Sequence, residues 1–322
     1  MRDHFMSTSA MAGEQEPWKH AIEWAKSFIL AIGILMIIHL LVLRWVIVQS
    51  TSMYATLLPG DLLLVQRWPV WTGLERGDVV VFRDPLKDRM PMGERPLMVK
   101  RIAAMPGDVL QIRDGDLFVN DVYHPPVETG TSAHLIHLRD HTVTDSLLSA
   151  LSLPASLVQP GRQMLELPLN DSLAEELEQW PQVVSATPMG PATGAPGHIF
   201  PFSPDFRWNG DDYGPIRIPA KGDTIRIGVR DLPLYDRLIS RYEGHTLSVS
   251  GNDILLDGKP LAYYVVEQDH YFMLGDSRHH SADSRYWGFV PHDHLMGRGW
   301  LILFSKGEQG LRKGRNWRSL SR

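Results

Sequence analysis

The chain has 322 residues, of which 43% are hydrophobic and 21% charged, so most of it is expected to be globular, with room for one large or two modest domains. Its formal net charge of −5 gives no general attraction to nucleic acid. The absence of cysteine excludes a disulfide framework, thiol catalysis and cysteine-ligated zinc.

An apolar run near the N-terminus predicts a transmembrane helix. Residues 28–48 read FILAIGILMIIHLLVLRWVIV, interrupted only by His39 and Arg44. At about 1.5 Å per residue, a helix of this length spans about 30 Å, the thickness of a bilayer core. A cleavable signal peptide has an apolar region of only about 7–15 residues. We therefore expect a single-pass anchor over 27–48 after a short cytoplasmic segment, 1–26; a buried core helix is the alternative.

The positive charges around this run give a small bias for its orientation. Arg2, Lys19 and Lys26 precede it, while Arg44 and Arg67 follow closely. By the positive-inside rule this slightly favours a cytoplasmic N-terminus. Because no second run of this length follows, we expect the chain from residue 49 onward to lie outside the cytoplasm.

The remainder has the pattern of β-structure. Short β-branched or alternating runs bounded by Gly, Pro and Asp predict strands within 78–85, 97–105 and 297–305. The stretches DVLQIRDGDLFVND (108–121) and HTLSVSGNDILLDG (245–258) resemble each other and predict two β-hairpins. The expected fold is therefore mainly β, with a core formed by 49–121 and 245–305.

The region between the two hairpins differs in character. NDSLAEELEQW (170–180) has a helix-capping signature, and ATPMGPATGAPG (186–197) predicts a loop. We interpret 122–244 as an inserted lobe, which we expect to influence substrate choice without supplying the chemistry. The basic end of the chain, 306–322, is expected to be a solvated tail; contact with anionic lipid is the alternative.

Four stretches follow one another in an order that resembles the conserved boxes of bacterial type I signal peptidases. They are STSMYATLLPGD (50–61), RGDVVVF (76–82), MVKRIAAMPGD (98–108) and GDSRHHSADSRYWGFVPHDHLMGR (275–298). The resemblance covers the anchor, 46–121 and 260–305, and it implies an antiparallel β catalytic core behind the membrane anchor. Members of that family are serine endopeptidases that remove signal peptides from exported preproteins through an acyl-enzyme, using a Ser/Lys dyad.

The resemblance assigns roles to particular residues. It implies that Ser52 is the nucleophile and Lys100 the general base. Ser281 matches the hydroxyl that orients the lysine, and Ser50 matches the hydroxyl that joins the Ser52 backbone N–H in an oxyanion hole. Five positions match the structural frame beneath the dyad: Gly275, Asp276, Arg278, Asp283 and Arg285. Six apolar positions match the substrate pockets: Val46, Val48, Met53, Leu57, Met98 and Val99.

The chemistry of such a dyad requires an unusual lysine. A serine hydroxyl is a weak nucleophile until a base removes its proton. A lysine with an ordinary pKa of about 10.4 is protonated at neutral pH, but desolvation lowers this pKa. Because Met98, Val99 and Ile102 surround Lys100 in the sequence, we expect it to be buried.

Several positions depart from the family pattern. Gln49 and Ala55 replace prolines, and Thr51 replaces a glycine. Thr51 matters most for the loop, since glycine adopts backbone angles that a β-branched residue avoids. In the last box the departures are Ser277, His279 and His280. Because neither member of the dyad is lost, we expect an active enzyme.

Some of these residues also have simpler interpretations. Asp283 and Arg285 alone are typical of a surface ion pair worth less than about 1 kcal/mol. The adjacent His279 and His280 suggest a metal site, but neighbouring residues on a strand point to opposite sides, so we expect no metal and no cofactor.

The family also implies partners and a location. Its substrates are preprotein signal peptides with small residues at positions −1 and −3. The expected location is the bacterial cytoplasmic membrane, with the catalytic domain on the extracytoplasmic face and the secretion translocon nearby; no nucleic acid is expected. Trp68 and Trp71 are either interfacial anchors in the bilayer or core residues.

Two other functions fit parts of the pattern. A self-cleaving repressor-type protease shares the Ser/Lys dyad, but it needs a DNA-binding domain and an internal cleavage loop, and neither is evident here. A catalytically inactive, membrane-anchored scaffold of an export complex needs neither Ser52 nor Lys100, and both are present.

Overall fold

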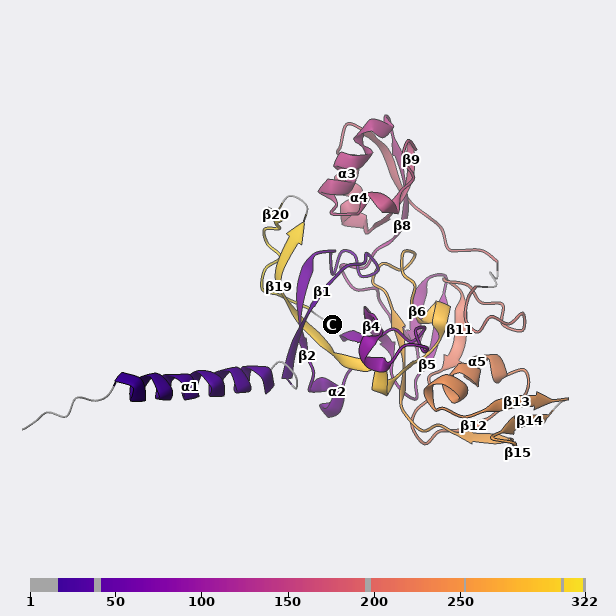
Figure 1. Cartoon of the computed structure of the whole chain (residues 1–322). Helices are drawn as coiled ribbons and strands as arrows, with labels where there is room; N and C mark the ends of the chain where they lie inside the picture. Colours follow the sequence, from indigo (N-terminus) through magenta and orange to yellow (C-terminus); the bar gives the residue numbers. More distant parts are fainter. Residues whose placement is uncertain (1–16, 38–41, 195–197, 252, 308–309, 321–322) are drawn as a thin grey trace, which may run out of the picture. The chain divides into compact units, whose positions relative to one another are not determined.

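A computed structural model describes residues 17–37, 42–194, 198–251, 253–307 and 310–320. It is mainly β, with antiparallel strand pairs, and the chain divides into a unit ending at Leu43 and a compact unit over Arg44–Arg322. Figure 1 shows the cartoon of the chain.

The N-terminal unit contains helix α1, Pro17–Ile37. Its apolar side chains are largely exposed, among them Phe28 at 68% and Leu35 at 64%. Within the described ranges, no helix has both the length and the hydropathy needed to cross a bilayer. Residues 38–41 of the expected anchor lie outside the described part of the chain.

The prediction of one helix through residue 48 is wrong at its C-terminal end. Strand β1 occupies Leu43–Ile47, and the next residue, Val48, exchanges backbone hydrogen bonds with the chain around β2, Asp61–Gln66. Val48 and Val46 pack with Leu63 and Val65 in one apolar cluster. Val46 and Val48 thus face a protein core, which a hydropathy count does not distinguish from lipid, whereas Ile47 is 61% exposed.

The largest sheet joins strands from both ends of the compact unit. Its order is β1-β2-β19-β3-β4-β17-β18. The remaining strands of this path are β3 (Val79–Arg83), β4 (Leu97–Ala104), β17 (His270–Leu274), β18 (Val290–Pro291) and β19 (Leu295–Gly307). The strands predicted within 78–85, 97–105 and 297–305 are confirmed as β3, β4 and β19.

The C-terminal segment is part of this sheet. Strands β20 (Gly310–Leu311) and β21 (Arg318–Ser319) both pair with β19. Arg315 donates to Asp61 at 2.6 Å and to the carbonyl of Thr56 at 3.0 Å. The segment 310–320 is therefore held on the sheet by backbone pairing and by its arginines, while most of its side chains remain exposed, as expected for a solvated tail.

Both predicted hairpins are present. The first is β5 (Val109–Arg113) with β6 (Asp116–Val119), and the second is β13 (Leu247–Ser250) with β14 (Asp253–Leu256). In the first turn Gly115 has φ of +85°, which glycine adopts without steric cost. The first hairpin is flanked by β7 (Val122–His124) and β11 (Tyr213–Arg217), and the second by β15 (Lys259–Pro260). A separate two-stranded sheet consists of β12 (Thr224–Arg226) and β16 (Tyr263–Val265).

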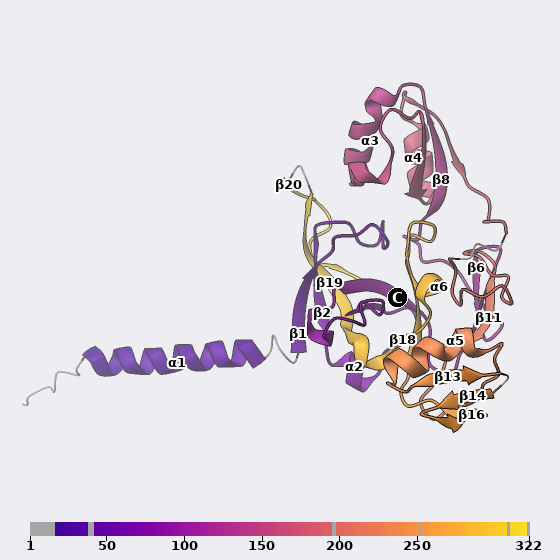
Figure 2. The same cartoon turned by 45° about the vertical axis from the view of Figure 1, so that its right-hand side comes forward.

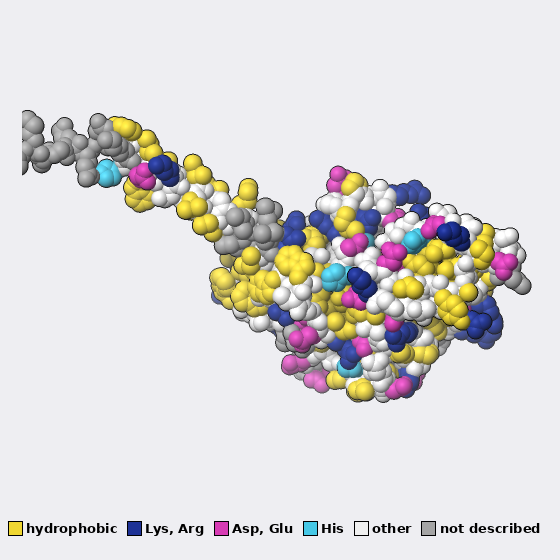
Figure 3. Space-filling model, turned by 90° about the horizontal axis from the view of Figure 1, so that it is seen from below, with side chains coloured by type: hydrophobic (Ala, Val, Ile, Leu, Met, Phe, Trp, Pro, Cys, Tyr) yellow, Lys and Arg dark blue, Asp and Glu magenta, His cyan; other side chains and the backbone are white. Residues whose placement is uncertain are grey.

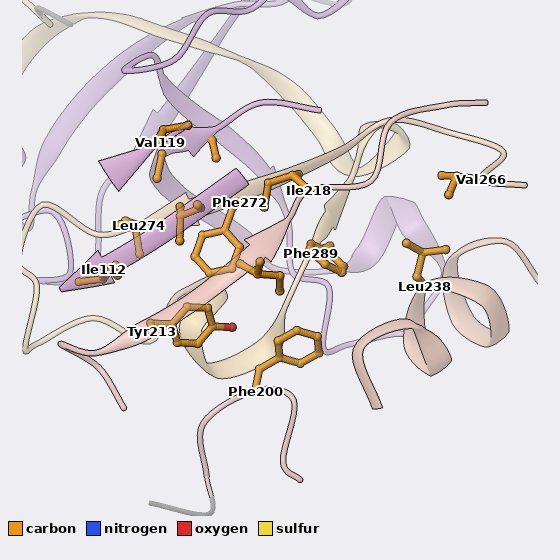
Figure 4. Close-up of a cluster of buried hydrophobic side chains, with 14 of the residues drawn as sticks. Ile112, Val119, Phe200, Tyr213, Ile218, Leu238, Val266, Phe272, Leu274 and Phe289 are labelled. Atoms are coloured by element: carbon orange, nitrogen blue, oxygen red, sulfur yellow. The ribbon is translucent and has the colours of Figure 1, made fainter. Parts of the chain in front are cut away.

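An aromatic core lies under the first hairpin. The rings of Tyr213 and Phe272 have centroids 5.5 Å apart, and those of Phe200 and Phe289 are 5.8 Å apart (Figure 4). Tyr213 belongs to β11, which pairs with β5, whereas Phe272 belongs to β17 of the largest sheet. This core therefore joins the hairpin sheet to the strand that precedes the last conserved box.

A separate small sheet has the order β10-β8-β9. We call it, with its two helices, the α/β lobe, residues 132–188 (Figures 1 and 2). Its elements are β8 (Ser132–Leu138), α3 (Thr144–Ala150), β9 (Met164–Leu169), α4 (Asp171–Glu178) and β10 (Val183–Pro188). The predicted helix is α4, and its cap is Asn170, which accepts from the N–H of Leu173 at 3.0 Å.

The region 122–244, expected as one inserted lobe, thus divides among three sheets, since its strand β12 pairs with β16. Only the α/β lobe has a sheet of its own; β7 and β11 join the sheet of β5 and β6. The other helices of the compact unit are short: α2 (Pro69–Thr72), α5 (Leu232–Arg237), the π-turn Leu238–Tyr242 and α6 (Ser284–Trp287). Single 3-10 turns occur at Met92–Glu94, His141–Val143, Ala155–Leu157 and His292–His294.

Candidate active site

Ser52 and Lys100 meet in the compact unit. Lys100 is in β4 opposite Val80 of β3, and its Nζ donates to Ser52 Oγ at 2.5 Å. Ser52 is in the turn that follows β1 and is 7% exposed, while Lys100 is 2% exposed. A primary amine and a hydroxyl are therefore held in hydrogen-bond contact away from bulk water.

Burial changes the acidity of the lysine. Desolvation lowers the pKa of Lys100 from 10.5 to about 8, although the negative charges of Asp283 and Asp276 act in the opposite direction. A pKa of about 8 leaves a useful fraction of the amine neutral near pH 7–8. The amine can therefore accept a proton from Ser52.

Two further serines surround the pair. Ser50 Oγ lies 3.1 Å from Ser52 Oγ, and either hydroxyl can be the donor. Ser281 is 5% exposed, and its Oγ has no hydrogen-bond partner in the described part of the chain. A Cβ on Gly275 would lie 2.2 Å from Ser281 Oγ and 2.5 Å from the carbonyl oxygen of Ser52. Gly275 thus allows Ser281 and the backbone of Ser52 to approach each other closely.

Asp283 and Arg285 form a buried ion pair. Arg285 Nε and one terminal nitrogen each donate to Asp283 at 2.9 Å, and the residues are 1% and 0% exposed. Asp283 also accepts from the N–H of Gly275 at 3.1 Å. The simple interpretation of a surface ion pair is wrong, since this bidentate pair ties helix α6 to the glycine beneath the dyad.

Asp276 anchors the strand of the lysine and the turn of the serine. It accepts from Arg101 Nε at 2.8 Å, from an Arg101 terminal nitrogen at 2.7 Å and from Thr56 Oγ1 at 2.7 Å. Its backbone N–H donates to Met53 Sδ at 3.4 Å. Arg278 contributes through its backbone: its carbonyl accepts from Arg285 at 2.5 Å.

A groove of about 620 Å³ opens beside the dyad. One wall comes from β1 and the turn after it, the other from the start of β4. Its lining residues are Arg44, Trp45, Val46, Ile47, Val48, Gln49, Ser50, Met53, Pro96, Leu97, Met98, Val99 and Lys100. Five of the six expected pocket residues are therefore present; Leu57 instead is fully buried in the apolar cluster under the turn.

Comparison with known proteins identifies the family. The model of the family "Signal peptidase, peptidase S26" matches residues 21–149 and 217–304, more than half of the chain. The chain belongs to this signal peptidase family.

Individual signal peptidases resemble the chain over shorter or weaker alignments. Signal peptidase I of Helicobacter pylori is 35% identical over 63 residues, 20% of this chain and 22% of that protein. Signal peptidase I of Buchnera aphidicola subsp. Schizaphis graminum is 48% identical over 48 residues, 15% of each chain. That of Buchnera aphidicola subsp. Baizongia pistaciae is 21% identical over 316 residues, 90% of this chain and 80% of that protein. The alignments with the first two span about a fifth or less of their length.

The departures from the signal peptidase pattern have structural explanations. Thr51 is not one of the described residues with a positive φ, so this turn does not require glycine. His279 Nδ1 accepts from the N–H of Ala133 at 3.1 Å, so Nε2 carries the proton and donates to Asp211 at 3.0 Å. His280 lies 3.7 Å from Glu166.

The two histidines therefore face different partners, and no group of three metal-ligating side chains occurs in the described segments.

Trp71 is 63% exposed and Trp68 36%, so the alternative of core residues is wrong for Trp71.

Some contacts of this candidate site were not predicted from the sequence. Arg101 is next to Lys100, and Thr56 is four residues after Ser52, so both lie within the family boxes. This position was the available signal for them. Asp211 is only 2% exposed and lies outside every box. Its contact with His279 depends on chain folding across 68 residues, which no local pattern reveals.

Proposed function

We propose that this chain is a serine endopeptidase that removes N-terminal signal peptides from preproteins. The observation that carries the proposal is the 2.5 Å contact between Lys100 Nζ and Ser52 Oγ in a buried setting. Membership of the signal peptidase family supports the same reaction.

In the proposed acylation step, the neutral amine of Lys100 removes the proton from Ser52 as Oγ attacks the scissile carbonyl carbon. The Ser50 hydroxyl and the Ser52 N–H donate to the oxyanion. The Lys100 ammonium then transfers its proton to the leaving amine as the C–N bond breaks. The signal peptide remains as an ester on Ser52, and the mature protein departs with a free N-terminus.

In the proposed second step, Lys100 activates a water molecule. The amine takes one proton from the water as its oxygen attacks the ester, and it returns that proton to Ser52 Oγ when the ester bond breaks. The signal peptide leaves as a carboxylic acid, which releases its remaining proton to solvent, and the enzyme is restored. Ser281 packs beside the dyad, and its unpartnered hydroxyl is available to orient the Lys100 amine.

The groove supports an extended substrate. Side chains two residues apart on an extended chain point to the same side, so the side chains at positions −1 and −3 of the substrate would face the same side of the groove. Val46 and Val48 line the groove on the β1 side, and Met98 lines it on the β4 side, so an apolar surface adjoins Lys100. We infer that alanine and similar residues at −1 and −3 are selected by this apolar lining.

We also propose that the N-terminal segment anchors the enzyme to the bacterial cytoplasmic membrane, with the compact unit on the extracytoplasmic side near the translocon. Apolar side chains cover much of α1, and Figure 3 shows them in yellow. A helix that exposes apolar residues so widely favours an apolar surrounding. Alkaline extraction of membranes, with a variant lacking 17–42 as control, tests this: wild type is expected in the pellet and the variant in the supernatant.

The enzymatic proposal is tested with purified protein and a preprotein in detergent. Ser52→Ala and Lys100→Ala are each expected to abolish cleavage, and Lys100→Arg as well, because guanidinium does not deprotonate in proteins. Ser146→Ala is the control, since this exposed serine donates only to the carbonyl of Val143 in the α/β lobe. Cleavage by Ser52→Ala at the wild-type rate would contradict the proposal.

A further inference from the structure

A short segment before β8 contacts the last conserved box. The N–H of Thr131 donates to the carbonyl of Asp276 at 2.8 Å, and the N–H of Arg278 donates to the carbonyl of Thr131 at 2.9 Å. Thr131 and Ser277 thereby form an isolated parallel bridge. Thr131 thus lies along the loop that begins at Gly275.

The same segment contacts the turn that carries Ser52. Thr131 Oγ1 donates to the carbonyl of Tyr54 at 3.2 Å. Two residues earlier, the hydroxyls of Thr129 and Thr56 lie 2.5 Å apart. Thr131 is 3% exposed, so its hydroxyl bond is shielded from competing water.

Tyr54 is held at its other end by the α/β lobe. Its hydroxyl donates to the carbonyl of Leu151 at 2.7 Å. The ring is 2% exposed and packs in the apolar cluster of the lobe with Leu148, Leu165 and others. Tyr54 is two residues after Ser52, and its N–H donates to the Thr51 carbonyl at 2.9 Å, so both residues belong to one tight turn.

We propose that Thr131 is a positioning residue for the proposed peptidase reaction. Through the Tyr54 carbonyl, its hydroxyl fixes the turn so that Ser52 Oγ lies within reach of Lys100 Nζ. Thr131 touches neither the substrate nor the reacting atoms. The proposal rests on the proposed function for its kinetic consequence, because a displacement of about 1 Å in a reacting group can cost about 100-fold in rate.

The test compares three variants of the full chain. Thr131→Val keeps the branched shape and removes the donor, while Thr131→Ser keeps the donor. Thr144→Val is the matched control: Thr144 is also buried, at 6% exposure, and also donates to a backbone carbonyl, that of His141 at 2.7 Å, but within the α/β lobe.

With a preprotein substrate, Thr131→Val is expected to lower kcat by about 10- to 100-fold while KM changes less than about two-fold. Thr131→Ser and Thr144→Val are expected to stay within about two-fold of wild type. A merely structural role would lower the melting temperature without lowering kcat per folded molecule. A wild-type kcat for folded Thr131→Val would overturn the proposal. If Thr131→Val does not fold, Thr131→Ala removes the donor without adding an apolar branch, and the same outcomes apply.

Hydrogen–deuterium exchange of the amides in 50–58 separates this proposal from the proposed function. Faster exchange in Thr131→Val than in Thr144→Val supports the positioning of the turn even if the wild-type protein cleaves no preprotein, an outcome that would overturn the proposed function alone. Unchanged exchange in Thr131→Val would overturn the positioning role whether or not the protein is active.

Discussion

Ser52 and Ser277 are joined through their backbones: the N–H of Ser277 donates to the carbonyl of Ser52 at 3.2 Å. This bond links the turn after β1 to the loop that follows β17, although the two residues are far apart in sequence. Gly275, two residues before Ser277, lies against the same carbonyl. The geometry of the dyad therefore depends on the close approach of these two loops.

Gly275→Ala is expected to abolish peptide cleavage and to destabilise the fold by about 1–3 kcal/mol, because the new methyl would overlap Ser281 Oγ and the Ser52 carbonyl. Urea denaturation and peptide cleavage measure the two effects. Gly93→Ala is the control, since a Cβ there meets nothing within 4 Å. Wild-type activity in folded Gly275→Ala would show that the close approach is not needed.

The pH dependence of kcat/KM is expected to show an acidic limb near the Lys100 pKa of about 8. Below this pH the amine is protonated and cannot accept the proton of Ser52, so the rate falls about ten-fold per pH unit. A histidine base would place the limb near about 6.5. The limb should persist in His279→Asn and His280→Asn; its loss in either variant would transfer the role of base to that histidine.

Lys100→Met is expected to stabilise the inactive protein at pH 7. In wild type the pKa of Lys100 is about 8 in the folded state and 10.5 in the unfolded state. Burial of the charged amine therefore lowers the free energy of unfolding by about 3 kcal/mol at any pH low enough for Lys100 to be protonated in both the folded and the unfolded chain. Loss of the hydrogen bond to Ser52 in Lys100→Met reduces this gain in the free energy of unfolding by about 1 kcal/mol. The cost disappears as pH rises from about 8 to 10.5, because only the unfolded chain then binds the proton.

Urea denaturation of Lys100→Met and wild type at pH 7 and pH 10 measures this difference. The stability gain should be largest at pH 7 and should shrink at pH 10. A gain of equal size at both values would show that the lysine charge is not buried at a cost.

Asp283→Asn is expected to cost about 3–5 kcal/mol, because it leaves the buried Arg285 guanidinium without its carboxylate. Asp205→Asn is the control: its pair with Arg230 spans 3.7 Å between exposed side chains and is worth less than about 1 kcal/mol. Loss of the Asp283 charge should also move the acidic limb of kcat/KM to lower pH, because that charge raises the pKa of Lys100. An unmoved limb in a folded Asp283→Asn would contradict this coupling.

Local sequence patterns predicted the regular elements well. The two hairpins and α4 were predictable because two-residue alternation and a capping residue act within a few positions of the chain. The helix expected through residue 48 failed because hydropathy is the same for a strand that faces a core and a helix that faces lipid. The pairing of the C-terminal segment with β19 was not predicted, because strand pairing of this kind is a property of the folded sheet.

The order of the boxes alone determined the family, and it named Ser52 and Lys100, since the motifs carry these residues within short fixed spacings. Only the tertiary structure decided which groups surround them. Asp276 accepts from Arg101 and Thr56, and His279 donates to Asp211. Thr131 donates to the Tyr54 carbonyl. Each of these contacts closes a loop of dozens of residues or more. Such a contact depends on the strand register and on which buried polar groups lack another partner. Neither of these features can be predicted from residues that are adjacent in the sequence.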